Sequence, residues 1–80
     1  MPAIAPIPPE QLKHVMECLG FIVVDEDQYN WLMDKEGRSD PPITIPKLGN
    51  LVALQVMDIV LQQAGINHFQ YFEALKSTQN

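Results

Sequence analysis

The stretch FIVVDEDQYNWLM, Phe21 to Met33, has the pattern of a β-hairpin. Its first arm is aromatic and β-branched, as strands commonly are, and three acids at positions 25–27 follow where the chain should turn. In the second arm Tyr29, Trp31 and Met33 occupy every second position, so a strand would place them on one face. We therefore expect two antiparallel strands joined by a short acidic turn.

A helix is expected before this hairpin, beginning at Pro9 and ending at Gly20. Apolar side chains recur there at the i, i+3, i+4, i+7 spacing of a single helical face: Leu12, Val15, Met16 and Leu19. Gly20 can adopt the left-handed conformation that ends a helix. Cys18 is the only cysteine, so it cannot form an internal disulfide, and its place in the helical pattern indicates a small apolar core residue.

A third strand and two further helices are expected after the hairpin. The segment Ile43–Ile45 has a strand composition and is followed by Pro46, which cannot donate to a ladder. A second helical stripe then ends at Gly65, and it consists of Leu54, Met57, Leu61 and Ala64, widened by Val56 and Val60. A short last helix should begin at Asn67, with Gln70 completing a capping box. Its docking side chains should be Phe69, Phe72 and Leu75.

This order predicts an α+β fold in which a three-stranded antiparallel sheet carries helices on one face. At 80 residues the chain has room for one modest core. Four of its seven prolines lie within the first nine residues, so residues 1–9 should form an extended proline-rich arm. We expect a single domain at residues 10–76 and a tail at 77–80.

The charge and hydropathy of the chain disfavour two classes of partner. The net charge is −5, and the five cations are scattered: Lys13, Lys35, Arg38, Lys47 and Lys76. Phosphate binding needs clustered cations, so RNA binding should be weak. Neither a signal peptide nor a run of about 20 apolar residues is evident, which predicts a cytoplasmic protein with no membrane partner.

The supply of catalytic and metal-ligating side chains is small. His14 falls on the polar side of the first helix and His68 just after a helix cap, so both should be surface histidines. The acids at 25–27 lack the spacing and the glycine of a calcium loop. We expect no metal, no cofactor and no small-molecule substrate. Tyr29 and Trp31 could stack bases or anchor a protein interface, although core packing is the simpler interpretation of Trp31.

Three motifs occur in a characteristic order along the chain: EQLKHVMECLGF at 10–21, ITIPKLGN at 43–50 and IVLQQAGI at 59–66. With these motifs the chain resembles the HicA (YcfA-like) family, small toxins of bacterial toxin-antitoxin pairs. The resemblance implies a double-stranded-RNA-binding-domain-like fold, α-β-β-β-α, to which this chain adds a short C-terminal helix.

The resemblance also implies what the hairpin should contain in an active toxin. HicA toxins are mRNA-cleaving endoribonucleases whose catalytic histidine belongs to a Gly-Ser-His motif on the second strand. The matching triplet here is Asp27-Gln28-Tyr29, which puts Tyr29 at the histidine position. A tyrosine, with an unperturbed pKa of about 10, cannot replace imidazole as a general base near pH 7. The helix that offers cations to RNA in the family carries Asp58 and Gln62.

These departures from the family motif predict a non-catalytic HicA-like binding domain of toxin-antitoxin ancestry. Its partner would be a HicB-like antitoxin or a second copy of the chain. The candidate binding surface, called the hairpin-tip surface below, consists of Gln28, Tyr29, Asn30, Trp31 and Lys47. Two alternatives stay open: a HicA-type endoribonuclease that uses His14, His68 or a partner's residues, and a weak binder of structured RNA that reads its shape.

Overall fold

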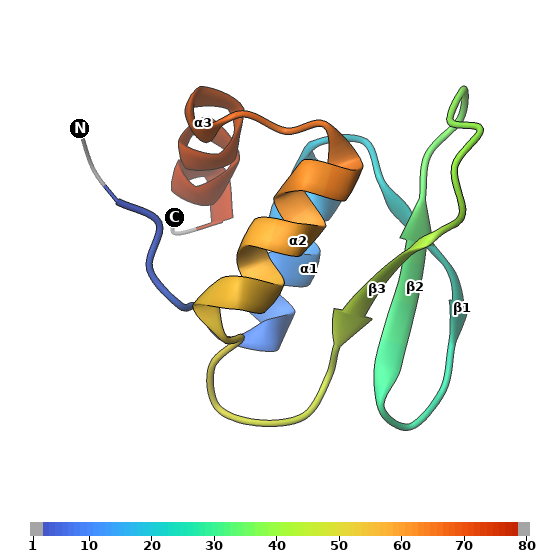
Figure 1. Ribbon diagram of the computed structural model, residues 1–80, viewed down its shortest axis with the longest axis horizontal. Helices are drawn as coiled ribbons and strands as arrows, with labels where there is room; N and C mark the ends of the chain where they lie inside the picture. The colour runs from blue at the N-terminus through green and yellow to red at the C-terminus, as the bar shows by residue number, and fades with distance from the viewer. Residues whose placement is uncertain (1–2, 79–80) are drawn as a thin grey trace.

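The computed structural model describes residues 3–78 (Figure 1). Its elements are α1 (Pro9–Cys18), β1 (Ile22–Glu26), β2 (Asn30–Asp34), β3 (Ile43–Pro46), α2 (Leu54–Ala64) and α3 (His68–Thr78). The expected α+β fold, with its double-stranded-RNA-binding-domain-like order and three-stranded antiparallel sheet, is confirmed. No helix in the described part of the chain is long and apolar enough to cross a membrane.

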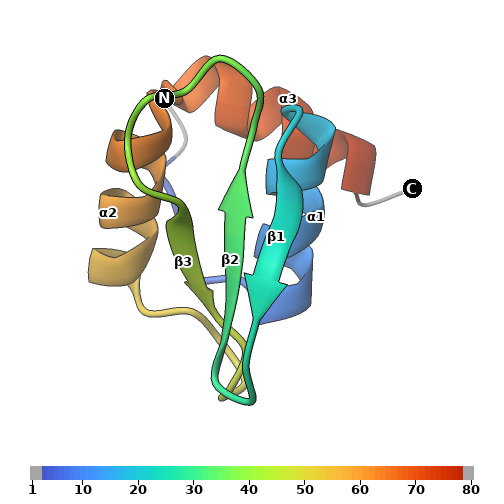
Figure 2. The same ribbon diagram turned by 90° about the vertical axis from the view of Figure 1, so that its right-hand side faces the viewer.

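The sheet is a meander in which β2 is central. Met33 of β2 pairs with Val23 on one side and with Ile43 on the other, so these three side chains share a face. A bulge between Val23 and Asp25 shifts the register of β1. The first strand is displaced from its expected position, because it continues through Glu26 and leaves the turn to residues 27–29. The helices all lie on the face that Met33 shares, and the other face is bare (Figures 1 and 2).

The core lies between this face and the helices. α1 and α2 bury the inner sides of their expected stripes, and the sheet, the loops and α3 supply the rest. The fully or almost fully buried apolar side chains are Ile7, Leu12, Val15, Met16, Phe21, Met33, Ile43, Ile45, Val52, Met57, Val60, Leu61, Tyr71 and Ala74. Leu54, expected in the second stripe, is 42% exposed at the start of α2. Val52, just before the helix, is buried instead.

Helix ends follow the local signals in the sequence. Gly20 and Gly65 have φ of 94° and 70°, the left-handed region that glycine enters without a Cβ clash. The amide of Phe21 donates to the carbonyl of Met16 at 3.0 Å, and a similar bond closes α2. At the start of α3 the Gln70 amide donates to Asn67 Oδ1 and the Asn67 amide donates to Gln70 Oε1, at 2.8 and 3.0 Å. The expected stops and capping box are confirmed.

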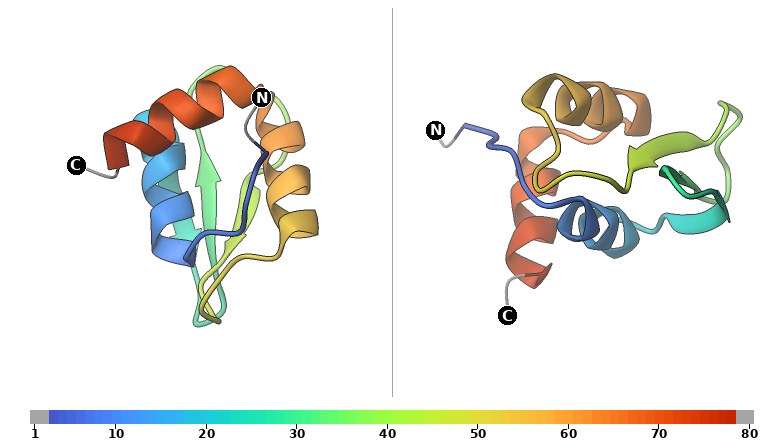
Figure 3. Two further views of the ribbon diagram at one scale, coloured as in Figure 1. Left: turned by 90° about the vertical axis from the view of Figure 1, so that its left-hand side faces the viewer. Right: turned by 90° about the horizontal axis from the view of Figure 1, so that it is seen from below.

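The last helix differs from the expectation in length and in orientation. α3 has 11 residues, as many as α2, and extends through Thr78; residues 79–80 of the expected tail lie outside the described residues. Phe69 was expected to dock the helix but is 73% exposed. Tyr71 and Ala74 are the buried residues, because α3 packs across α1 through a face that lies roughly opposite Phe69 on the helix (Figure 3).

The proline-rich arm is extended, and part of it belongs to the folded domain. Residues 3–8 have no helix or strand and run across the space between α1 and α2 (Figure 3). Ile7 is only 9% exposed, and its carbonyl accepts the Val52 amide at 2.8 Å. Pro9 is buried as the first residue of α1, a position that suits proline. The expected arm, residues 1–9, thus helps to close the helical side of the core; residues 1–2 lie outside the described residues.

Cys18 is the residue of α1 whose burial differs most clearly from the expectation. It was interpreted as a core residue, and that interpretation is wrong, because its side chain is exposed. One residue corresponds to about 100° of rotation round a helix, so Cys18 lies well away from the direction of Leu19, which packs against the core.

Candidate functional site

The turn of the hairpin is organised by one carboxylate. Asp27 Oδ1 accepts the backbone N–H groups of Tyr29 and Asn30, both at 2.8 Å. The Asp27 amide in turn donates to the carbonyl of Asn30 at 3.0 Å. An aspartate that bonds the backbone ahead of it stabilises a tight turn. The acid at position 27 therefore has a structural role in holding the tip of the hairpin.

The same hydrogen bonds set the titration of Asp27. The N–H group of Tyr29, and next that of Asn30, lower the pKa of this carboxyl below its ordinary value of 3.8, because they bond its charged form. A carboxyl whose pKa is lower in the folded than in the unfolded chain stabilises the fold at pH values above its unfolded pKa. This stabilisation is lost as the pH falls through its folded pKa.

We therefore expect Asp27→Ala to lower stability near neutral pH and to converge with the wild type in acid. Urea unfolding of both proteins between pH 2 and pH 7 checks this, and an NMR titration should place the Asp27 carboxyl below 3.8. If the unfolding free energies of the two proteins, plotted against pH, stay parallel down to the lowest pH, the turn does not depend on the charge of Asp27.

Tyr29 lies in the turn, one residue before β2, and is 56% exposed. Its carbonyl accepts the backbone N–H of Lys47 at 2.8 Å, which ties the tip of the hairpin to the chain leaving β3. Along the line of Tyr29, Trp31 and Met33 the burial increases, since Trp31 is half-buried and Met33 is fully buried. The three side chains that the sequence pattern places on one face thus extend from solvent into the core.

Trp31 is held at the edge of the core by two lysines. It lies opposite Ile45 on the helix-facing side of the sheet and packs against the core residues. The ammonium groups of Lys13 on α1 and Lys47 after β3 lie 5.4 and 5.6 Å from the centroid of its ring. Such contacts are attractive because the face of the indole is electron-rich. Trp31 is therefore mainly a packing residue whose ring is already in contact with two cations.

Both lysines also have carboxylate partners. Lys47 forms an ion pair with Glu26 of β1, and Lys13 lies 3.8 Å from Glu17 one turn later on α1. At the other end of the sheet the Arg38 guanidinium donates to Asp34 at 2.7 Å and holds the pKa of that carboxyl low. Lys13, Lys47 and Arg38 are thus already partnered within the fold.

The structure brings the residues of the hairpin-tip surface together. Gln28 and Tyr29 are exposed, whereas Asn30, Trp31 and Lys47 are half-buried. Lys13 was missed by the sequence analysis, since nothing local indicates that α1 reaches Trp31. Its spacing to Glu17 was the one readable signal, as a lysine and a glutamate four residues apart meet on a helix.

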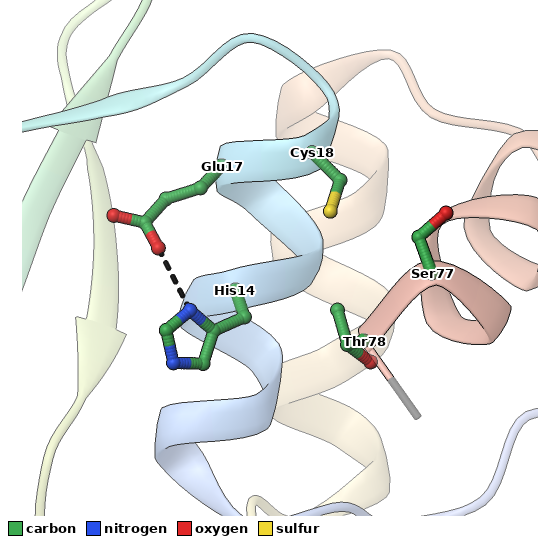
Figure 4. A pocket seen from close by; sticks show the side chains of 5 residues that line it. All are labelled: His14, Glu17, Cys18, Ser77 and Thr78. Atoms are coloured by element: carbon green, nitrogen blue, oxygen red, sulfur yellow. Dashed lines mark hydrogen bonds and ion pairs between the residues drawn. The ribbon is translucent and has the colours of Figure 1, made fainter. Parts of the chain in front are cut away.

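The histidines lie elsewhere. His14 borders a surface hollow of about 470 Å³ whose walls come from α1 and α3: Glu17, Cys18, Ser77 and Thr78 (Figure 4). Its Nδ1 lies 2.9 Å from Glu17 Oε1, and the ring turns toward Glu17 and away from the Cys18 sulfur (Figure 4). The exposed ring of His68 lies nearly perpendicular to the ring of Phe72 on α3, with the two ring centroids 6.5 Å apart.

Neither histidine belongs to the hairpin. The hollow beside His14 is lined by helix residues, with no contribution from β2. In residues 3–78, no group of three or more His, Cys, Asp and Glu side chains could hold a metal ion. The tip presents the exposed Tyr29 beside the side-chain amides of Gln28 and Asn30.

Comparison with family models, with curated proteins and with solved structures finds no match to this chain.

Proposed function

We propose that this chain is a HicA-like domain of toxin-antitoxin ancestry that binds a protein and does not cleave RNA. The observation that carries the proposal is Tyr29, which stands where the family motif has its catalytic histidine and which is exposed at the tip of the hairpin. Proton transfer needs a group within hydrogen-bond reach of the reacting atom. The only two histidines, His14 and His68, lie on α1 and at the start of α3, so neither belongs to this turn.

The charges near the hairpin support the same proposal. An RNA-cleaving surface needs cations for the phosphates, and each phosphate contact makes binding salt-dependent. Here Lys13 and Lys47 are partnered by Glu17 and Glu26, and the chain carries a net charge of −5. RNA would have to compete with carboxylates for both lysines.

The partner we propose is a cytoplasmic HicB-like antitoxin meeting the hairpin-tip surface. Tyr29 is well suited to such a contact, because a tyrosine offers apolar area and a hydroxyl with only two side-chain torsions to order. The turn that presents it is fixed by Asp27 and by the backbone bond to Lys47, so little backbone freedom is lost on binding.

The first test is an RNA cleavage and binding assay at low salt with a chelator present, on the wild type beside Tyr29→His. We expect no cleavage by the wild type above the buffer control, and RNA binding that is weak and collapses as salt is raised. Cleavage by the wild type would overturn the proposal, and His14→Ala and His68→Ala would then identify the histidine responsible.

The second test uses a HicB-like protein encoded beside this chain. Tyr29→Ala is expected to weaken the complex about tenfold or more, as loss of an aromatic anchor does. His68→Ala changes another exposed ring side chain, on α3, and should leave the affinity unchanged. Equal losses in the two variants, measured by calorimetry, would place the interface elsewhere.

A further inference from the structure

The bare face of the sheet is unusually apolar along β1. Ile22 and Val24 are 63% and 51% exposed, and Leu32 of β2 is half-buried on the same side. An antiparallel sheet with one face in water normally carries polar residues at the outward positions. None of the helices covers this face within the described residues (Figure 2). Exposed β-branched side chains side by side mark such a face as a contact surface.

A hollow on this face has charged side chains along its rim. It has a volume of about 270 Å³ and is lined by Ile22, Val24, Asp34, Lys35 and Glu36. Asp34 already forms an ion pair with Arg38. Lys35 and Glu36 have no ion-pair partner within residues 3–78, and the Lys35 ammonium lies over the Phe21 ring at 5.2 Å, a contact that leaves its charge uncompensated. The rim thus presents one cation next to one anion.

We propose that a second copy of this chain covers this face, in a two-fold symmetric dimer. In a two-fold interface residue i meets residue j and residue j meets residue i. Adjacent charges of opposite sign are therefore self-complementary, since Lys35 of each copy can pair with Glu36 of the other. A partner with charge of a single sign would leave one of the two unsatisfied, whereas a second copy satisfies both and buries Ile22 and Val24 against their equivalents.

The dimer should be weak, because the apolar patch is small compared with the roughly 800 Å² per partner of stable complexes. It also leaves the hairpin tip free, since Lys35 and Glu36 follow the opposite end of β2 (Figure 2). The face that forms this dimer is separate from the hairpin-tip surface proposed for the antitoxin-like partner. The dimer does not depend on whether the domain cleaves RNA.

Sedimentation velocity of the full chain at concentrations up to about 1 mM tests the proposal. The wild type should show a reversible dimer. Lys35→Glu alone and Glu36→Lys alone should each raise the dimer Kd about tenfold, because every substitution occurs twice and replaces attraction by repulsion. An equimolar mixture of the two variants should restore the dimer, since both ion pairs then form, one with its sign reversed and the other as in the wild type.

Two controls separate the interface from the fold. Glu36→Lys, Val24→Thr and Ile59→Thr should leave the circular dichroism spectrum and the unfolding midpoint unaltered. Lys35→Glu should leave the spectrum unaltered although it removes the contact with the Phe21 ring. Val24→Thr should weaken the dimer, while Ile59→Thr, at a 53% exposed position on α2, should not. A wild type that stays monomeric throughout the concentration range, or a mixture no tighter than either single variant, would overturn the proposal.

Discussion

Replacing Phe21 with alanine is expected to lower the free energy of unfolding by about 3–5 kcal/mol. Phe21 is 1% exposed at the junction of α1 and β1, and its ring also lies beneath the Lys35 and Arg38 cations at 5.2 and 5.7 Å. A domain of this length has a total stability of about 4–12 kcal/mol, so the variant should be at the edge of unfolding. Urea denaturation followed by circular dichroism measures the change.

Phe69 provides the matched control for this experiment. It is the same residue type in the same chain, but it is 73% exposed on α3. Phe69→Ala should change the free energy of unfolding by no more than about 0.5 kcal/mol. A loss comparable to that of Phe21→Ala would mean that α3 docks through Phe69, as the helical spacing alone had indicated.

The second large effect concerns the proline-rich arm. Ile7→Ala should lower the free energy of unfolding by about 2–3 kcal/mol, because an isoleucine that is only 9% exposed leaves a cavity when it is truncated. The backbone bond from Val52 to Ile7 fixes the arm in the same place. Thermal and urea unfolding measure the loss.

Ile59 is the isoleucine to compare with Ile7. It is 53% exposed on the outer side of α2, so Ile59→Ala should be nearly neutral. If Ile7→Ala were equally neutral, the arm would be an appendage, and residues 10–76 would fold without it. A large loss from Ile7→Ala would instead make the arm part of the smallest unit that folds.

The two surfaces assigned here lie at opposite ends of the hairpin. Tyr29 and Lys47 are at its tip, while Ile22 and Lys35 are at its open end (Figure 2). A dimer formed through the bare face of the sheet therefore presents two hairpin tips to other proteins. Such an arrangement would bind a bivalent partner more tightly than a single chain does, because the second contact is made at high effective concentration.

The sequence by itself determined the elements and most of their boundaries. Gly20 and Gly65 end their helices, Asn67 and Gln70 cap α3, and Pro46 is the last residue of β3. Each of these features depends on residues within one turn of helix or one strand. The three-stranded meander follows as well, since alternation and short loops leave few other ways to bury one face of the sheet.

The tertiary structure alone decided which side chains face solvent and which meet across the fold. Phe69 lies outside the core, although it shares the helical spacing of Phe72 and Leu75, because the angle at which α3 crosses α1 selects the buried face. Lys13 reaches Trp31 only because α1 packs beside the hairpin. Helical period and strand alternation are local properties of the chain, whereas contacts between distant segments depend on how whole elements dock.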